Sequence, residues 1–167
     1  MKNSSNRGSC QEVNIVYVTS CSEDSLLRGA HAISAALFLS NGIRYWVSLR
    51  VVLRVKRRQE CLVSLVRISG REIRWLRPGE RNLLGFLNTL FKGRSWPGAR
   101  LIHLKEPSYD ELVPSSCLPI GEYLGSPNMC PECILVDEEK LEACLKPWWL
   151  LASLMVVNDA GCRQRCG

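Results

Sequence analysis

The heptapeptide PIGEYLG, residues 119–125, combines two glycines with a carboxylate and an aromatic ring. Gly121 and Gly125 lack a Cβ and tolerate positive φ, so each allows a ligand to lie close to bare backbone. Glu122, between them, supplies a group that can accept a proton. The same composition also suits an ordinary surface turn. Taken alone, the segment is therefore compatible with a binding loop and with a plain turn.

Basic side chains form a second candidate for chemistry. The chain holds 22 Lys and Arg against 16 Asp and Glu, a net charge of +6, and the stretch RVKRRQE alone carries four basic residues. Such a patch favours a polyanion through counterion release. The alternative is a solvated face that keeps the protein soluble. We expect a nucleic acid as the partner, and the candidate phosphate contacts are Arg44, Arg54, Arg57, Arg58 and Arg81.

Nine cysteines are many for a chain of this size. CPEC (130–133) and CRQRC (162–166) are close pairs, but His31 and His103 do not complete a recognised zinc spacing, so we expect no metal. Disulfides in a heat-adapted cytosol would account for the cysteines better. We expect at least one intramolecular disulfide, with the C-terminal pair as the favoured participants. A small metal-binding domain around CPEC is the remaining alternative.

Apolar periodicity predicts the elements that must position these residues. Strands are expected over 13–18, 47–55, 61–68 and 100–104, with a short one over 71–76. Helices are expected over 25–39, 78–92 and 148–159. Gly42 is the expected C-terminal cap of the first helix, and Pro78 and Gly93 bracket the second. Strands alternating with helices indicate an α/β layered sheet flanked by helices.

Length and composition bound the protein class. A chain of 167 residues is expected to form one domain, here residues 13–167, preceded by a flexible polar tail at 1–12. No apolar run reaches the roughly 18 residues that a membrane span needs. The N-terminus lacks the apolar core of a signal peptide. The sequence therefore predicts a cytoplasmic protein with no membrane partner.

Two segments of the N-terminal half match a known pattern in combination. SAALFLSNGIR (34–44) is similar to A-L-F-L-S-x-x-I-R, and VRISGREIRWLRPGER (66–81) is similar to I-R-I-x-G-x-E-L-R-x-L-x-P-D-E-R. Together they resemble the archaeal tRNA pseudouridine N1-methyltransferases, which belong to the SPOUT superfamily of knotted methyltransferases. The resemblance implies a SPOUT-type sheet with a C-terminal trefoil knot.

Three segments of the C-terminal half resemble the cofactor-binding parts of that family, in the same order. LIHLKEPS (101–108) resembles L-I-Y-L-H-E-D-G, a strand and its turn. IGEYLG (120–125) resembles L-G-D-H-x-G, the glycine loop that approaches S-adenosylmethionine. CLKPWWLLASLM (144–155) resembles S-L-G-P-x-S-L-L-A-S-H-C, the last cofactor loop and the start of the final helix. The resemblance therefore favours a cofactor loop over a plain turn at PIGEYLG.

The implied activity is an S-adenosylmethionine-dependent N1-methylation of a pseudouridine in the T-loop of tRNA, performed by a homodimer. Glu122 or Glu106 is the implied acceptor of the N1 proton. Trp148 and Trp149 either shape the cofactor pocket or fill the dimer interface. By the resemblance, cofactor-binding residues are Leu104, Gly121, Gly125, Cys144, Leu145, Lys146, Pro147, Trp148, Trp149, Leu150 and Met155.

The chain also departs from the family pattern. The arginine–aspartate pair before the first helix is missing, and Trp46 replaces an acidic residue. Tyr123, Lys146 and Met155 replace a histidine, a glycine and a cysteine. Backbone-mediated cofactor binding tolerates these changes better than side-chain contacts to RNA do. The alternative function is therefore a non-catalytic RNA-binding or assembly protein on a degenerate SPOUT fold.

Residues 126–145 have two competing interpretations. Read locally, VDEEKLEACL (136–145) is a charged helix. The family pattern instead implies a helix over 126–136 and a strand over 139–145. Ser126 followed by Pro127 is a good helix start and favours the second interpretation.

Overall fold

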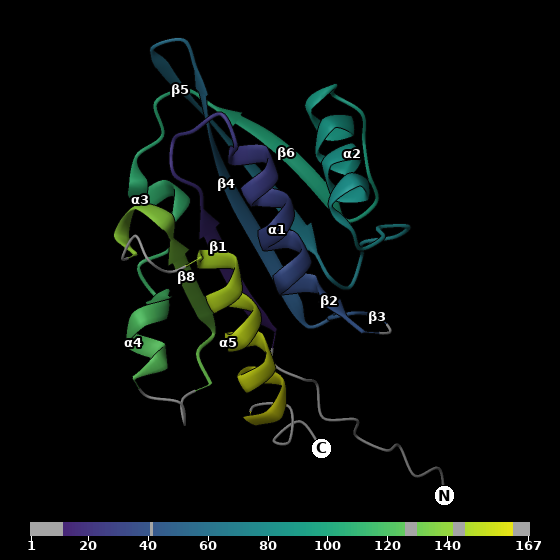
Figure 1. The fold of residues 1–167 in the computed structure, drawn as a ribbon, viewed down its shortest axis with the longest axis vertical. Coiled ribbons are helices and arrows are strands. Elements are labelled where there is room, and N and C mark those ends of the chain that lie inside the picture. Colours follow the sequence, from purple (N-terminus) through teal and green to yellow (C-terminus); the bar gives the residue numbers. More distant parts are fainter. Residues whose placement is uncertain (1–11, 41, 126–129, 142–145, 162–167) are drawn as a thin grey trace, which may run out of the picture.

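The computed structural model describes residues 12–40, 42–125, 130–141 and 146–161 (Figure 1). Its centre is a mixed sheet in the order β6-β5-β4-β1-β8-β7. The strands of this sheet are β1 (Val13–Val18), β4 (Val47–Arg57), β5 (Glu60–Ser69), β6 (Ala99–Leu104), β7 (Leu118–Pro119) and β8 (Cys133–Asp137). The helices are α1 (Ser25–Leu37), α2 (Glu80–Phe91), α3 (Tyr109–Leu112), α4 (Ile120–Leu124) and α5 (Pro147–Gly161), with a 3-10 turn η1 (Glu138–Lys140). The predicted α/β class is confirmed.

Strand directions bring several strand ends to one edge of the sheet. β1 is parallel to β4 and to β8, and β7 is parallel to β8. β5 runs antiparallel between β4 and β6, so β6 points the same way as β4. The carboxyl ends of β1, β4, β6 and β8 therefore share an edge. Ligands of open α/β sheets bind outside such an edge.

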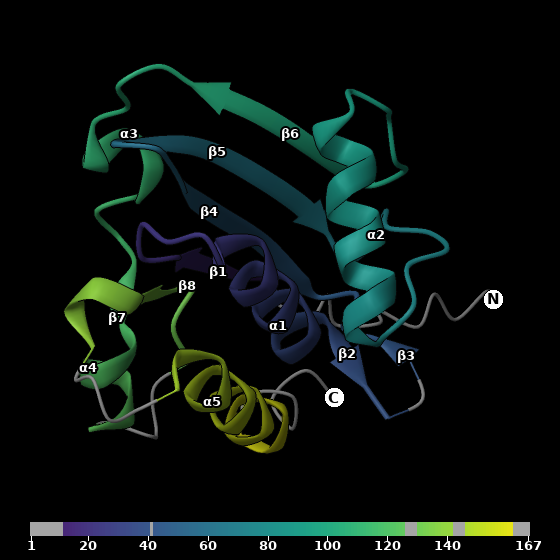
Figure 2. The ribbon, with the colours of Figure 1, turned by 45° about the horizontal axis from the view of Figure 1, so that its top comes forward.

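Three helices cover one face of the sheet. Figures 1 and 2 show α1, α2 and α5 on the same side. Alternate strand residues such as Ile15, Leu49 and Ile68 pack against the apolar faces of these helices and form one buried cluster with them. α1 approaches β4 closely at Gly29, where an added Cβ would lie 2.5 Å from Cδ2 of Leu53. This layer is the main core of the fold.

The opposite face has a smaller core. Val18, Val52 and Leu65 are buried there with Leu112 and Val113, which belong to α3 and the residue after it. The four residues of α3 lie near the carboxyl ends of the strands (Figure 2). Of the described helices, only α3 contributes side chains to this cluster. Much of this second face is therefore left to strand side chains alone.

Several sequence-based expectations are confirmed. β4 and β5 form the expected hairpin, in which Arg57 pairs with Glu60. Their β-branched, alternating sequence suits a strand with one face in the main core. α2 begins after Pro78 and Gly79, and Gly93 beyond its end has a φ of 75°. That positive φ explains the glycine at this helix terminus.

The end of α1 was predicted too far along the chain. The helix ends at Leu37, and Phe38–Leu39 (β2) pairs with Gly42–Ile43 (β3) as a small hairpin. Gly42 therefore lies in a strand and is not the C-terminal cap. The carbonyls of Ala35, Ala36 and Phe38 accept hydrogen bonds from the guanidinium of Arg44 instead. The Arg44 side chain thus satisfies carbonyls at the helix end, which at many other helices are satisfied by a turn with a left-handed glycine.

Two further expectations were wrong. Residues 71–76 form no strand but an irregular turn, in which Trp75 has a φ of 59°. Residues 133–136, predicted as the end of a helix, belong to β8, a buried strand between β1 and β7. The apolar run CILV satisfies its backbone in two parallel ladders, which explains the strand. Residues 126–129 and 142–145 lie outside the described residues, and 138–140 form the 3-10 turn.

Candidate ligand-binding site at the carboxyl edge of the sheet

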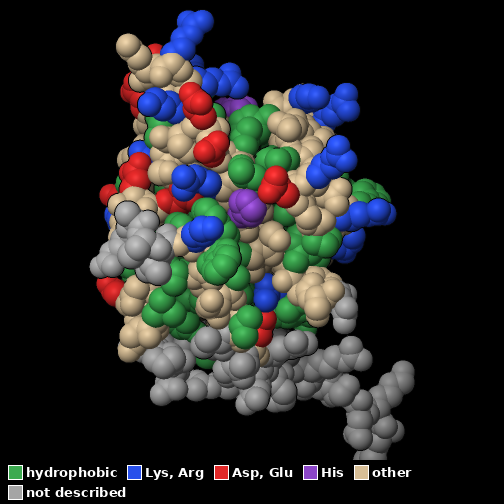
Figure 3. Space-filling view, in the orientation of Figure 1, with side chains coloured by type: hydrophobic (Ala, Val, Ile, Leu, Met, Phe, Trp, Pro, Cys, Tyr) green, Lys and Arg blue, Asp and Glu red, His purple; other side chains and the backbone are tan. Residues whose placement is uncertain are grey.

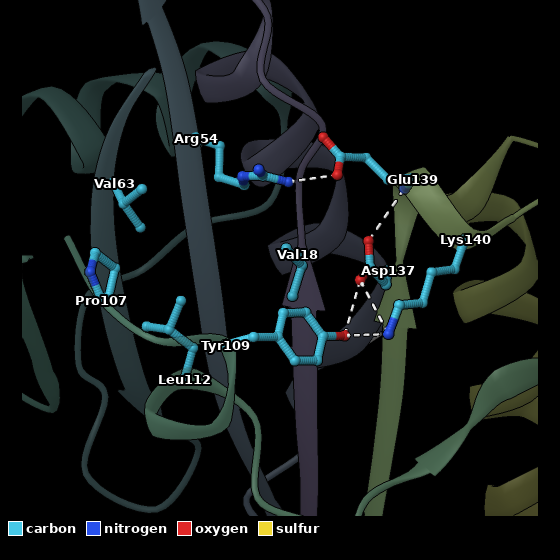
Figure 4. A pocket seen from close by; sticks show the side chains of 9 residues that line it. All are labelled: Val18, Arg54, Val63, Pro107, Tyr109, Leu112, Asp137, Glu139 and Lys140. Atoms are coloured by element: carbon cyan, nitrogen blue, oxygen red, sulfur yellow. Dashed lines mark hydrogen bonds and ion pairs between the residues drawn. The ribbon is translucent and has the colours of Figure 1, made fainter. Parts of the chain in front are cut away.

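A cavity of about 390 Å³ lies at the edge where the parallel strands end. Figure 4 shows its walls, which come from four strands, from the segment after β6 and from η1. Its lining residues are Val18, Arg54, Val63, Pro107, Tyr109, Leu112, Asp137, Glu139 and Lys140. The volume is within the range of small-molecule sites, roughly 300–1,000 Å³.

Asp137 is the central polar group of the cavity. It is the last residue of β8 and is only 6% exposed. Its Oδ2 accepts a hydrogen bond from the Tyr109 hydroxyl at 2.8 Å, and its Oδ1 accepts one from the backbone N–H of Glu139 at 3.1 Å. Lys140 Nζ lies 4.0 Å from Oδ2. A carboxylate held from both sides in this way is fixed in orientation.

Tyr109 and Lys140 form a second contact across the cavity mouth. Lys140 Nζ donates to the Tyr109 hydroxyl at 3.1 Å and lies 4.3 Å from the centre of its ring. Burial raises the pKa of Tyr109, and the Lys140 hydrogen bond opposes this while Asp137 adds to it. The hydrogen bond with Tyr109 in turn raises the pKa of Lys140. At neutral pH the pair is therefore a neutral phenol beside an ammonium.

Arg54 and Glu139 close the other side. Arg54 Nη1 lies 2.7 Å from Glu139 Oε2, and the Arg54 backbone N–H donates to Oγ1 of Thr19 at 2.9 Å. With Asp137 and Lys140, the lining holds two charges of each sign. These charges balance, so the cavity favours a zwitterionic or weakly charged ligand over a free polyanion.

The remaining walls are apolar. Val18, Val63 and Leu112 line the cavity beside Pro107. Leu104 is the ladder partner of Val63 and packs against the same cluster. An apolar wall facing convergent polar groups is the usual composition of a small-molecule site.

A neighbouring network holds η1 in place. The Glu138 side chain is 2% exposed and accepts hydrogen bonds from the Tyr17 hydroxyl at 2.6 Å and from the Ser20 N–H at 2.7 Å. Arg28 on α1 lies 3.4 Å from the same carboxylate. Burial first, and then the hydrogen bond to Glu138, raise the pKa of Tyr17 far above its ordinary value. Because Glu138 is flanked by Asp137 and Glu139, this network fixes both cavity acids.

Three residues singled out from the sequence lie at or beside the cavity. Arg54 lines it, and Leu104 lies beside Val63 as its ladder partner. Glu106 is exposed and immediately precedes Pro107 of the cavity wall. Its φ of 46° is in the left-handed region, which is unusual for a residue before proline. Such local strain is concentrated at functional sites.

The PIGEYLG segment is not an open loop. Residues 120–124 form the short helix α4, which buries Ile120 and Tyr123 in the main core. Gly121, Glu122 and Gly125 are exposed, and a Cβ added to Gly121 would meet nothing within 4 Å. The expected loop conformation was therefore wrong, and nothing in the described structure crowds Gly121.

The predicted cofactor residues of α5 lie on the helix-covered face. Trp148 stacks on His31 of α1 with ring centres 5.2 Å apart, and Met155 is fully buried in the main core. Lys146 Nζ lies 5.5 Å from the ring centre of the exposed Trp149. Pro147 is buried and Leu150 packs against the same core, whereas Cys144 and Leu145 lie outside the described residues. The structure thus separates these side chains from Leu104 by the thickness of the sheet.

The predicted phosphate contacts have different surroundings. Arg44 is 5% exposed and its guanidinium pairs with Asp159, so it is committed to the interior. Arg57 and Arg58 are exposed at the turn of the β4–β5 hairpin, and Arg81 is exposed on α2. Figure 3 shows Lys and Arg side chains projecting from that hairpin and from the α2 side of the molecule. Arg54, Arg57 and Arg58 follow one strand from the cavity outward.

The cysteines bear out the expectation of an intramolecular disulfide. Cys21 bonds to Cys61, and Cys117 bonds to Cys133. The favoured C-terminal pair lies outside the described residues. Within the described ranges, no three His, Cys, Asp or Glu side chains converge as metal ligands, and Cys133 of CPEC is taken up in a disulfide.

Tyr109, Asp137 and Lys140 were missed by sequence reasoning. Asp137 directly follows the apolar run ILV, which is the signal of a carboxylate at a buried strand end. The two interpretations of 126–145 instead place ILV at the end of a helix over 126–136, or Asp137 within a charged helix over 136–145, so neither predicts a strand that ends at Asp137. Tyr109 follows Ser108, whose side chain caps α3, and carried no pattern of its own.

A scan with models of known protein families finds no match to this chain, and a comparison with curated protein sequences finds none either. No helix in the described part of the chain has the length and apolar character needed to cross a membrane. The fold and the site define an α/β protein with a candidate ligand cavity at the carboxyl edge of its sheet.

Proposed function

We propose that the chain is an S-adenosylmethionine-dependent RNA methyltransferase whose cofactor binds in the carboxyl-edge cavity. The supporting observation is that Leu104, the cofactor-wall residue of the family resemblance, is the ladder partner of Val63 in the cavity wall. Resemblance and geometry thus indicate the same end of β6. The substrate proposed from the resemblance is a pseudouridine in tRNA.

The lining residues fit the chemistry of this cofactor. Its adenosine part needs an apolar wall, which Val18, Val63 and Leu112 supply. Its amino-acid part is a zwitterion, and the cavity presents carboxylates and cations side by side. Asp137 is the natural acceptor for ribose hydroxyls or the ammonium group, because its carboxylate is buried and fixed.

When bound, the cofactor supplies a methyl group on an electrophilic sulfonium. The chain's own contribution is to bind, orient and exclude water, which supplies much of the rate of such displacements. N1 of the target base must also lose a proton. Both candidate bases are exposed, but Glu106 adjoins the cavity wall, whereas Glu122 lies on α4. We therefore assign the proton to Glu106.

A second candidate function is a non-catalytic RNA-binding protein on the same fold. It is favoured by the position of Trp148 and Met155, which pack into the helix-covered face and not beside Leu104. The balanced charges of the cavity would then stabilise the sheet edge alone. The two functions differ in one property, because only the methyltransferase transfers a methyl group to RNA.

Incubation of the protein with methyl-labelled S-adenosylmethionine and pseudouridine-containing tRNA tests the proposal. We expect labelled N1-methylpseudouridine after digestion to nucleosides. The Glu106→Gln variant should lower kcat while leaving cofactor affinity unchanged, and Glu111→Gln on α3 is the matched control. RNA that binds but stays unlabelled across substrates would support the second candidate.

A further inference from the structure

Three arginines lie side by side on the sheet face that α1, α2 and α5 leave free. Arg50 on β4 is the ladder partner of Arg67 on β5, which is the ladder partner of Arg100 on β6. Their neighbours along each strand, such as Val51 and Val66, are buried in the main core on the other side. Alternation along the strands therefore places all three arginines on the opposite face.

The row borders a hollow of about 510 Å³. Its other lining residues are Ser48, Ile68, Ser69, Glu72, Ser95, Trp96, Gly98 and Ala99. Glu72 is the one acidic residue among them, and within the described ranges none of the three arginines makes an ion pair or a side-chain hydrogen bond. Like charges directly opposite each other across strands destabilise a sheet. An anionic partner would offset the repulsion between these arginines.

An exposed aromatic residue, Trp75, comes three residues after Glu72 of the hollow and is joined to it through Trp96. Trp96 lines the hollow, and its Nε1 donates to the carbonyl of Arg74 at 2.9 Å. Trp75, which follows Arg74 in the chain, is 78% exposed and has a φ of 59°. A bulky residue in the left-handed region is a true outlier, and such strain is maintained where a site requires it.

We propose that this face binds a single-stranded segment of RNA, with phosphates on Arg67 and Arg100 and a base stacked on Trp75. Arginine rows neutralise phosphates, and exposed aromatic rings take up unpaired bases, whereas the bases of a duplex are already stacked. The inference rests on the proposed function in naming RNA as the partner. It concerns a different surface from the cavity, and its test contains no cofactor.

The first test measures binding of a labelled single-stranded oligoribonucleotide at several salt concentrations. The Arg67→Gln/Arg100→Gln variant should bind more weakly, and its log–log salt slope should fall by about two, one for each lost phosphate contact. The control removes two charges on the α2 side, as Arg77→Gln/Lys92→Gln, and should keep the wild-type slope. The proposal would be overturned if the salt slope fell equally in both double variants, or if it fell in neither.

Thermal unfolding of the same arginine variant separates binding from a structural role. Because the change relieves like-charge repulsion, its melting temperature should equal or exceed that of the wild type. A large drop in melting temperature would mean that the arginines support the fold, and it would count against the proposal.

The stacking contact has its own control in the second exposed tryptophan. Trp75→Ala should weaken binding of the single strand roughly tenfold and barely change binding of a duplex of the same sequence. Trp149→Ala, which removes another exposed indole, on α5, should change neither. Equal effects of the two substitutions would exclude a base on Trp75. If the Arg67→Gln/Arg100→Gln variant keeps its RNA binding but loses binding to anionic phospholipid vesicles, the arginines bind a membrane surface. That result would refute RNA as the partner.

Discussion

The guanidinium of Arg44 lies 3.0 Å from the carboxylate of Asp159 and joins the end of α1 to α5. The same side chain donates to three carbonyls at the end of α1. The IR dipeptide of the family-like segment SNGIR therefore has a structural explanation. Its arginine replaces a glycine cap and ties the last helix to the first.

Removal of this contact should destabilise the protein. Arg44→Gln leaves the partly buried Asp159 and the helix carbonyls without their partner, and we expect a loss of roughly 3 kcal/mol in the free energy of unfolding. Urea denaturation measures it. If the variant has unchanged stability but binds RNA more weakly, Arg44 contacts RNA phosphates and does not support the fold.

High pH should destabilise the fold through Tyr17. Its pKa is raised in the folded state by burial and by Glu138, so above about pH 10 the folded chain holds a proton that the unfolded chain has lost. Stability then falls as pH rises, by up to about 1.4 kcal/mol per pH unit for one proton. Denaturation at pH 9 to 11 should show a shallower decline for Tyr17→Phe than for the wild type. Parallel declines would contradict the assignment.

The disulfide between Cys21 and Cys61 should contribute substantially to stability. It joins residues 40 apart, so the chain-entropy estimate is about 4 kcal/mol, against about 3 kcal/mol for Cys117–Cys133 at a separation of 16. In denaturant titration the Cys21→Ser/Cys61→Ser variant should lose about 4 kcal/mol of unfolding free energy and unfold at a lower denaturant concentration. Thiol counting on denatured, unreduced protein should find at most five free thiols of nine, and nine would refute both bonds.

The predicted homodimer can be tested on α5. Trp149 and Val156, seven residues apart on this helix, are 67% and 64% exposed and share a face. Substitution of both by glutamate should convert a dimer to a monomer in analytical ultracentrifugation. A wild-type protein that is already monomeric at high concentration would contradict the predicted homodimer.

The fold followed from the sequence where periodicity was strong. The β4–β5 hairpin, α1 and α2 have clean apolar patterns, whereas α5 was expected from a long apolar run; the existence of all of them was predicted correctly. β8 was missed because CILV is too short and uniformly apolar to separate strand from helix by periodicity. Only its two parallel neighbours, remote in sequence, make it a strand.

The candidate site was less accessible to sequence reasoning. It is assembled from residues such as Arg54, Tyr109 and Asp137, which come together only through sheet topology. The glycines of PIGEYLG predict a close approach of a ligand to the backbone. In the structure Gly121 sits in a short helix with free space around it, so the glycine signal did not identify the cavity.

Titration calorimetry with S-adenosylmethionine, without RNA, tests the central claim most directly. The wild type should bind one cofactor per chain, and Asp137→Asn should weaken binding at least about tenfold, as expected for a lost charge-assisted hydrogen bond. Asp110→Asn on α3 is the matched control and should bind normally, and so should Gly121→Val, because its side chain meets open space. No heat of binding for the wild type, or a loss of affinity in Gly121→Val but not in Asp137→Asn, would contradict a cofactor site in the carboxyl-edge cavity.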